Sequence, residues 1–154
     1  MLRMKLAHFA MGKTDMPDEG FRKWLGVEYD VMEDGHAVVS MTIRDEMRNL
    51  RGVVQGGVIA SLVDIVMATA AAGGNYDTRK RPMATLELKV NYLAAATGKK
   101  LIGRADVIRA GSRTSAVRCE IHTDSGEICA AGLGTFITRR IHPTDPAGLA
   151  PPEG

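Results

Sequence analysis

The chain has 154 residues, 45% of them hydrophobic and 25% charged, and its formal net charge is +2. This length and balance predict one globular domain with a hydrophobic core. The small net charge and the aromatic content of 5% exclude a nucleic-acid surface built on a strongly basic face or on stacked aromatic side chains. No apolar run is long enough to span a membrane, and the N-terminal sequence MLRMKLAHFAMG lacks a signal-peptide cleavage site, so we expect a cytoplasmic protein.

Hydrophobic periodicity predicts the elements of the first half of the chain. Residues 17–26 have the spacing of a short amphipathic helix. Apolar and polar residues then alternate in 27–31 and 37–43, on either side of the turn sequence EDG, which predicts a β-hairpin. A loop leads from this hairpin to a long apolar helix, which we expect to end at Gly73 and Gly74.

Strand patterns fill the second half of the chain. Residues 85–92 alternate between apolar and polar side chains. Three further strands are predicted near 100–110, 113–124 and 127–139, joined by tight turns at the sequences AGSR and DSGE. Residues 141–154 are rich in proline, and we expect this tail to be disordered.

The order of these elements predicts the fold class. Two strands, one long helix and four more strands give an antiparallel sheet with a single apolar helix to cover, and the economical arrangement wraps the sheet around the helix. We expect an α+β domain over residues 26–140, after an N-terminal segment 1–25 that carries the short helix and before the tail at 141–154. A sheet of about six strands leaves edge strands that a second copy can pair.

The two cysteines are expected to be free thiols. If HTDSGEI forms a hairpin, its register places Cys129 opposite His122, and Cys119 and His122 point to opposite faces of the sheet. That geometry disfavours a disulfide. The four histidines are scattered without the spacing of metal ligands, so no metal site is predicted.

Asp64 is unusual because it lies inside an otherwise apolar helix. Its neighbours Leu62, Val63, Ile65 and Val66 are all apolar. A helix that is apolar on every side is normally buried, and a buried carboxylate needs a compensating partner or a chemical role. We therefore interpret Asp64 as a candidate base or nucleophile.

Three further residues complete a candidate catalytic constellation with Asp64. Gly56, at the start of the helix, offers a backbone N–H group and the positive end of the helix dipole, which can stabilise an oxyanion. Asn49, just upstream, can donate from its side-chain amide to the same oxygen. Thr85 can orient Asp64 or a water molecule. Asn49 and Thr85 are also common in turns and strands, so a purely structural role for either remains an open alternative.

At these residues the sequence resembles the hot-dog fold acyl-coenzyme A thioesterases, specifically the PaaI-like (phenylacetate-degradation) group. The signature of that group reads approximately N-x-x-G-x-x-H-G-G, followed by an acid seven residues beyond the second glycine. The sequence NLRGVVQGG and Asp64 fit that spacing. The resemblance covers roughly residues 25–138, and it implies the hot-dog fold, an antiparallel sheet of about six strands wrapped round one long central helix.

The resemblance implies a role for each matched residue. Asn49 and the Gly56 amide would polarise a thioester carbonyl, Asp64 would activate water or attack, and Thr85 would position the water. Gln55 stands where the commonest motif has histidine. Gln55 can form hydrogen bonds but cannot titrate near neutral pH, so any role that requires an imidazolium is excluded.

The resemblance also implies contacts with coenzyme A. The segment NYLAAAT and the turn RAGSR match stretches that hold the pantetheine and phosphates in relatives. The residues assigned to these contacts are Tyr92, Arg109, Gly111, Ser112 and Arg113. Ordinary turn arginines would look the same as phosphate-binding ones, so that alternative stays open.

Together these expectations describe a thioester hydrolase that converts an acyl-coenzyme A into the free acid and coenzyme A. No metal or redox cofactor is implied, and coenzyme A enters only as part of the substrate. The alternative is a non-catalytic module of the same fold that binds or senses acyl-coenzyme A, in which Gln55 marks lost chemistry.

We also expect a homodimer, assembled further into a tetramer as a dimer of dimers, with no nucleic-acid or membrane partner. Gly56 and Asp64 are eight residues apart, which is about 12 Å along a helix. One chain therefore cannot easily bring both groups to one reacting carbonyl. A two-fold dimer can do so by setting Gly56 of one chain against Asp64 of the other.

Overall fold

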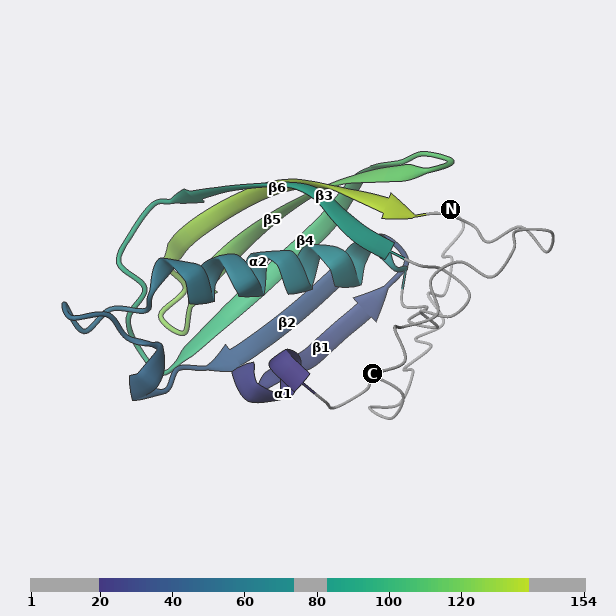
Figure 1. The fold of residues 1–154 in the computed structure, drawn as a ribbon. Helices are drawn as coiled ribbons and strands as arrows, with labels where there is room; N and C mark the ends of the chain where they lie inside the picture. The colour runs from purple at the N-terminus through teal and green to yellow at the C-terminus, as the bar shows by residue number, and fades with distance from the viewer. Residues whose placement is uncertain (1–19, 74–82, 139–154) are drawn as a thin grey trace, which may run out of the picture.

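The computed structural model describes residues 20–73 and 83–138 of the chain. In this part, a six-stranded antiparallel sheet curves around one long helix (Figure 1). In chain order the elements are α1 (Gly20–Leu25), β1 (Val27–Glu33), β2 (His36–Thr42), the 3-10 helix η1 (Asp45–Met47), α2 (Gly56–Ala71), β3 (Met83–Tyr92), β4 (Lys100–Ala110), β5 (Thr114–Thr123) and β6 (Ile128–Thr138). The predicted α+β fold and its element order are confirmed.

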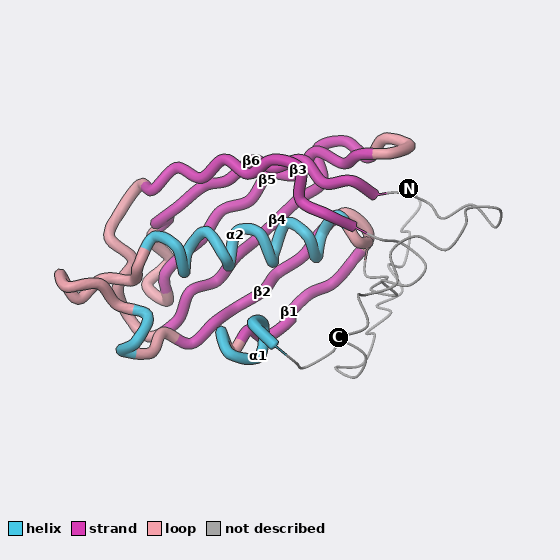
Figure 2. The backbone as a smooth tube through the Cα atoms, viewed as in Figure 1, coloured by secondary structure: helices cyan, strands magenta, loops and turns pink. Residues whose placement is uncertain are grey.

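The sheet has the strand order β1-β2-β4-β5-β6-β3, and every neighbouring pair is antiparallel. The segment that contains α2 crosses from β2 to the far edge, so β3 pairs with the last strand, β6. In Figure 2 the sheet curves around α2, with β1 and β2 below the helix and β6 and β3 above it. The edges of the sheet are therefore β1 and β3, and most side chains of β3 are exposed.

The core lies between α2 and the concave face of the sheet. Alternating residues of the strands point inward, among them Val39, Leu101 and Ile121, and all three are fully buried. From the helix, Leu62 and Val66 are fully buried in the same cluster. The long apolar run that predicted this helix is therefore explained by a sheet that covers it on several sides.

Glycines on the concave face let α2 approach the sheet closely. A Cβ atom on Gly132 would lie 2.8 Å from Val63 Cγ1, and one on Gly134 would lie 3.0 Å from Met67 Cε. Both distances are shorter than normal packing allows. The helix side chains thus lie against strand backbone at these positions, and a larger residue at either glycine requires Val63 or Met67 to move.

The ends of α2 follow from the flanking residues. Gln55 is the N-cap residue, with extended backbone and no capping hydrogen bond from its side chain. At the other end, Gly73 has φ +62°, a left-handed conformation that ends helices and that glycine adopts without strain. The predicted end at Gly73 is confirmed, and Gly74 lies outside the described residues.

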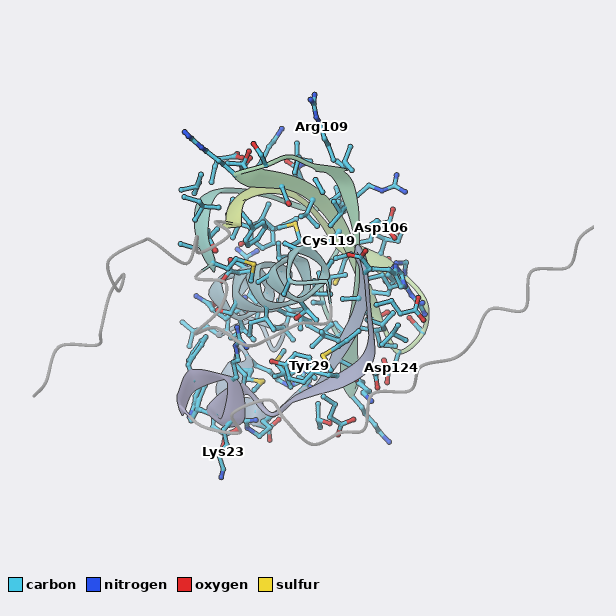
Figure 3. All side chains as sticks on the ribbon, turned by 90° about the vertical axis from the view of Figure 1, so that its right-hand side faces the viewer. Lys23, Tyr29, Asp106, Arg109, Cys119 and Asp124 are labelled. Atoms are coloured by element: carbon cyan, nitrogen blue, oxygen red, sulfur yellow. The ribbon has the colours of Figure 1, made fainter. Side chains whose placement is uncertain are left out.

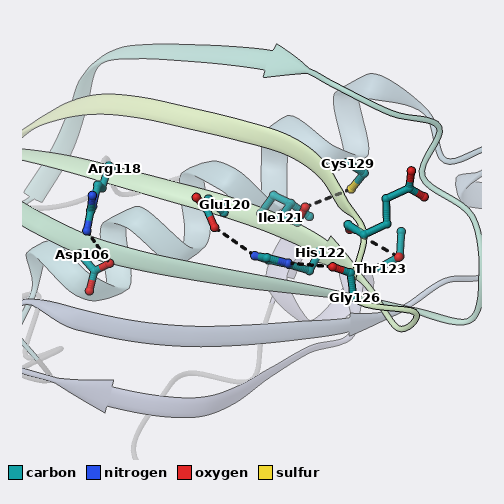
Figure 4. Close-up of polar contacts among 9 residues, drawn as sticks. Asp106, Arg118, Glu120, Ile121, His122, Thr123, Gly126 and Cys129 are labelled. Atoms are coloured by element: carbon teal, nitrogen blue, oxygen red, sulfur yellow. Dashed lines mark hydrogen bonds and ion pairs between the residues drawn. The ribbon is translucent and has the colours of Figure 1, made fainter.

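Both cysteines are free and buried, as predicted. Burial raises the pKa of the Cys119 thiol to about 12, which keeps it protonated and unreactive at neutral pH. The predicted register of the β5–β6 hairpin is wrong by one residue, because His122 pairs with Ile128 and not with Cys129. The pairing shifts between Ile121 and His122, and Cys129 instead donates its thiol hydrogen to the Ile121 carbonyl oxygen at 3.3 Å (Figure 4).

Several predictions fall outside the described residues. They are the start of the short helix at 17–19, the last residue of the strand predicted at 127–139, and the disordered tail at 141–154. The domain limits at 26 and 140 stay predictions. In the described ranges, neither helix has the length and apolar character needed to cross a membrane.

The close contact between helix and sheet gives a stability prediction. We expect Gly132→Ala to destabilise the fold by about 1–3 kcal/mol, because the new methyl group overlaps Val63. The matched control is Gly57→Ala, where a Cβ meets nothing within 4 Å and the loss of backbone entropy favours alanine. Urea unfolding midpoints measure both changes. Equal midpoints for Gly132→Ala and the wild type would refute the close approach.

Candidate active site

Asp64 lies on the one face of α2 that the sheet leaves uncovered. The residues of this face are Gly57, Ala60, Ser61 and Asp64, which are partly or fully exposed, whereas most of the remaining helix is buried. The expectation of a fully buried carboxylate is thus wrong for the single protomer. Asp64 is half-buried because its neighbours on this face are small, so they leave its carboxylate open to solvent.

The structure brings Asp64 together with Thr85. The Thr85 hydroxyl donates a hydrogen bond to Asp64 Oδ1 at 2.7 Å. Thr85 lies in β3 beside the irregularity between Thr85 and Glu87, and β3 is in contact with α2. The second carboxylate oxygen, Oδ2, has no hydrogen-bond partner among the described residues. Oδ2 can therefore accept a proton from a bound molecule. The predicted pairing of these two residues is a direct contact.

The loop before α2 fixes the orientation of Asn49. The backbone N–H of Arg51 donates to Asn49 Oδ1 at 2.8 Å, and the backbone groups of Asn49 bond across the loop to Val53 and Gly52. This Asx-type turn uses the side-chain oxygen. The amide nitrogen Nδ2 is left as the donor, which is the role predicted for Asn49.

The start of α2 presents backbone donors. The N–H of Gln55 bonds to the Met47 carbonyl oxygen at 2.8 Å, and the Gln55 carbonyl accepts from Val58 at 2.9 Å. The Gln55 side chain is exposed. The next amides, Gly56 and Gly57, belong to the first turn, whose N–H groups have no acceptor within the helix. We refer to Asn49, Gln55 and Gly56 as the oxyanion end, and to Asp64 and Thr85 as the acid end.

Tyr92 packs against the oxyanion end. Its hydroxyl donates to the Gly56 carbonyl oxygen at 2.9 Å, and a Cβ on Gly56 would lie 3.3 Å from the tyrosine ring. This contact explains why glycine suits position 56. Tyr92 is thus apart from the four other residues assigned to coenzyme A, because Arg109 lies near the end of β4 and Gly111, Ser112 and Arg113 lie in the β4–β5 turn.

The β4–β5 turn lies at the opposite end of the molecule from the oxyanion end. In Figure 1 α2 begins at the left and ends at the right, where this turn also lies. Arg109 extends outward at the top of Figure 3, and Arg109, Ser112 and Arg113 are all exposed. The structure explains why position 111 is glycine, because a Cβ there would lie 2.9 Å from the Thr114 carbonyl oxygen. One chain therefore does not bring this turn to Gly56, and the phosphate contacts stay predictions.

An open cleft of about 560 Å³ adjoins the acid end. Its walls come from α1, α2 and β3, through Phe21, Arg22, Ala60, Ser61, Asp64, Ile65 and Leu88. Phe21 and Leu88 are not among the site residues predicted from the sequence. The sequence signal for this cleft is the pair of aromatic residues, Phe21 and Trp24, in the short helix at 17–26. A helix that only covers a core does not need to expose such residues.

The site contains no obvious metal centre. In the ranges 20–73 and 83–138, no group of three His, Cys, Asp or Glu side chains is arranged to hold a metal ion. The chemical groups that the site does offer are a carboxylate bonded to a hydroxyl at the acid end, and amide donors at the oxyanion end. Such groups suit acyl transfer, in which water is deprotonated while negative charge develops on a carbonyl oxygen.

Several known proteins are similar in sequence to this chain. A family model described as the thioesterase superfamily matches residues 51–130. A candidate esterase of Saccharolobus solfataricus is 30% identical over 118 residues, covering 77% of this chain and 82% of that protein. The medium/long-chain acyl-CoA thioesterase YigI of Escherichia coli is 25% identical over 130 residues, with 76% and 84% covered. A match to a candidate esterase of Archaeoglobus fulgidus, 29% identical, covers 68% of this chain but only 65% of that protein.

Solved structures share the fold. The conserved protein PA5202 from Pseudomonas aeruginosa superposes with a TM-score of 0.71 at 30% identity, over 78% of this chain and 94% of that one. A mutant of the phenylacetic acid degradation protein PaaI from Thermus thermophilus gives 0.68 at 24% identity, over 77% and 97%. The hot-dog fold expected from the sequence is confirmed.

Proposed function

Because this chain belongs to the thioesterase superfamily, we propose that it hydrolyses acyl-coenzyme A thioesters, with Asp64 as the base that activates water. The observation that carries the proposal is the 2.7 Å hydrogen bond from Thr85 to Asp64, at the edge of an open cleft. The substrate class is supported by the name of the Escherichia coli relative, an acyl-CoA thioesterase.

The proposed reaction uses both ends of the site. Asp64 Oδ2 accepts a proton from a water molecule whose oxygen forms a bond to the thioester carbonyl carbon. The carbonyl oxygen takes up negative charge, and Gly56 N–H and Asn49 Nδ2 donate hydrogen bonds to it. The oxyanion then re-forms the carbonyl as the carbon–sulfur bond breaks, and the sulfur takes the proton from Asp64, so that coenzyme A leaves as the free thiol and the free acid is the other product. Thr85 holds the carboxylate in the orientation that leaves Oδ2 toward the water.

In this proposal each active site is shared between two chains. Eight residues separate Gly56 from Asp64, which is about 12 Å along α2, whereas a reacting carbonyl must lie within about 3 Å of its donors. The exposed edge strand β3 supplies a surface for a second copy, because none of the strands described in residues 20–73 and 83–138 pairs with its outer backbone groups. The oxyanion end of one protomer then faces the acid end of its partner.

The Asp64 assignment predicts a large loss of activity. We expect Asp64→Asn to lower kcat about a hundredfold or more, because an amide cannot accept the proton from water. Thr85→Val should lower kcat less, since the carboxylate remains. Asp106→Asn is the matched control, because Asp106 is also a partly exposed carboxylate bonded to a side chain, that of His36. Free coenzyme A is measured with a thiol-reactive dye. The dye does not react with Cys119 or Cys129, because both are buried.

A folded Asp64→Asn protein with near-normal activity would contradict the base assignment. The unfolding midpoint provides the check on folding, and we expect it to change little because asparagine can still accept from Thr85. If the wild type binds acyl-coenzyme A but releases no coenzyme A from any of these substrates, the non-catalytic alternative replaces the proposal.

Gln55 gives a prediction about pH. We expect Gln55→His to retain activity and to add a limb to the pH profile near about 6.5, where imidazole titrates and glutamine does not. Gln55→Ala should be less active than either, because it removes a hydrogen-bonding group from the oxyanion end. The measurement is kcat/KM across pH 5 to 9 for the three proteins. Equal activity of the alanine variant and the wild type would assign Gln55 no role in the reaction.

The shared site can be tested by mixing two inactive variants. Asn49→Ala and Asp64→Ala are unfolded and refolded together in equal amounts, so that about half of the dimers contain one chain of each. Each mixed dimer then has one doubly damaged site and one intact site, and about a quarter of wild-type activity should return. Each variant refolded alone is the control. No recovery in verified mixed dimers would mean that each site lies within one chain.

A further inference from the structure

Two aromatic side chains of α1 lie side by side on the surface. Phe21 is 57% exposed and Trp24 is 54% exposed. Their ring centroids are 5.9 Å apart and the planes differ by 13°, so the rings are stacked. Contiguous exposed apolar surface is where ligands and other proteins bind.

Arg44 holds this aromatic pair in place. Its guanidinium donates to the Trp24 carbonyl oxygen at 2.6 Å and to the Leu25 carbonyl oxygen at 3.2 Å. The same group lies 5.4 Å from the centre of the Trp24 ring, within cation–π range. Arg44 thus satisfies the carbonyl groups at the end of α1 and supports Trp24. Trp24 is therefore held by Arg44, and Phe21 stacks on the ring that Arg44 supports.

Phe21 is also a wall of the cleft beside Asp64. Opposite α1, the apolar lining consists of Ala60 and Ile65 from α2 and Leu88 from β3. In the end-on view of Figure 3, the sheet curves over α2 and α1 lies at the lower left, on the side that the sheet leaves open. The Ser61 hydroxyl donates to the Gly57 carbonyl oxygen at 2.9 Å, so its hydrogen is already used within the helix.

We propose that this cleft binds the acyl part of the substrate, and that Phe21 sets a preference for apolar acyl groups much longer than acetyl. This inference rests on the proposed function, since the thioester carbonyl must sit at Asp64 for its acyl group to enter the cleft. A volume of about 560 Å³ is in the usual range for sites that hold extended apolar ligands and far exceeds the needs of a two-carbon group. The apolar side chains of Phe21, Ile65 and Leu88 come from three elements and favour an apolar acyl group. The polar part of the lining consists of Arg22, Ser61 and Asp64.

The chain contains one tryptophan, Trp24, which stacks on the cleft residue Phe21, so its fluorescence reports on that wall of the cleft. The probe is S-octyl-coenzyme A, a thioether that cannot be hydrolysed, and coenzyme A alone is the control ligand. We expect a saturable change in Trp24 emission with S-octyl-coenzyme A and none with coenzyme A. Phe21→Ala should weaken the binding of the octyl probe about tenfold. No change with the octyl probe, or the same change with both ligands, would overturn the proposal.

Kinetics give the second readout. We expect Phe21→Ala to lower kcat/KM for octanoyl-coenzyme A about tenfold while leaving acetyl-coenzyme A unchanged, because only the longer chain contacts the ring. Phe21→Leu, which keeps apolar bulk, should retain most of the preference. Leu133→Ala is the matched control, since Leu133 is 45% exposed on β6 and does not line the cleft. An equal effect of Phe21→Ala on both substrates would overturn the proposal.

The two readouts separate this inference from the proposed function. If the wild type hydrolyses neither substrate but the octyl probe still changes Trp24 emission, the hydrolase assignment fails and the apolar cleft stands. If both substrates are hydrolysed and Phe21→Ala changes nothing, the cleft assignment fails and the hydrolase stands. If Phe21→Ala instead alters the elution volume on size exclusion, the aromatic pair is a protein interface and the proposal is wrong.

Discussion

The close packing of α2 against a glycine-containing sheet is the constraint on which the site depends. Gly132 and Gly134 allow Val63 and Met67 to reach the strand backbone, so the helix is buried on the faces that the sheet surrounds. Only the face with Ala60 and Asp64 remains open. A helix buried this firmly cannot rotate, and a carboxylate on its open face therefore keeps one direction, toward β3. Packing in the core thus determines where Asp64 can act.

Strand β3 links the two ends of the site to the edge of the sheet. Thr85 bonds to the acid end, and Tyr92 bonds to the oxyanion end through the Gly56 carbonyl. Both contacts come from a strand that forms one edge of the sheet in the part of the chain that the structure describes. A second copy that pairs with β3 would therefore influence both ends at once. In such an assembly, dimer formation and catalytic geometry depend on the same strand.

The sequence predicted the elements well because each has a strong local pattern. The hairpin of β1 and β2, the long apolar helix and the alternating strands all follow from periodicity, and Asp64 was found because it breaks one such pattern. The register at His122 could not be predicted in this way, because the shift that skips Cys129 is a local departure from alternation within the hairpin. The cleft could not be predicted from the sequence for a different reason. The position of α1, which forms one wall, involves hydrogen bonds from Arg44 to the backbone of Trp24 and Leu25, about twenty residues earlier in the chain. Local sequence patterns do not show such contacts.

The small residues around Asp64 explain how a charge is tolerated in an apolar helix. Gly57, Ala60 and Ser61 leave the carboxylate partly in water, and Thr85 supplies its hydrogen bond, so the protomer does not carry the cost of a buried, unpaired charge. The same absence of bulk opens the space in which a substrate can approach the carboxylate. The stability of the charged carboxylate and the access of substrate to it therefore both require small residues on this face of the helix. A larger side chain at Ala60 would shield Asp64 from water and fill the cleft at the same time, so the identity of these small residues is tied to the chemistry as closely as Asp64 itself.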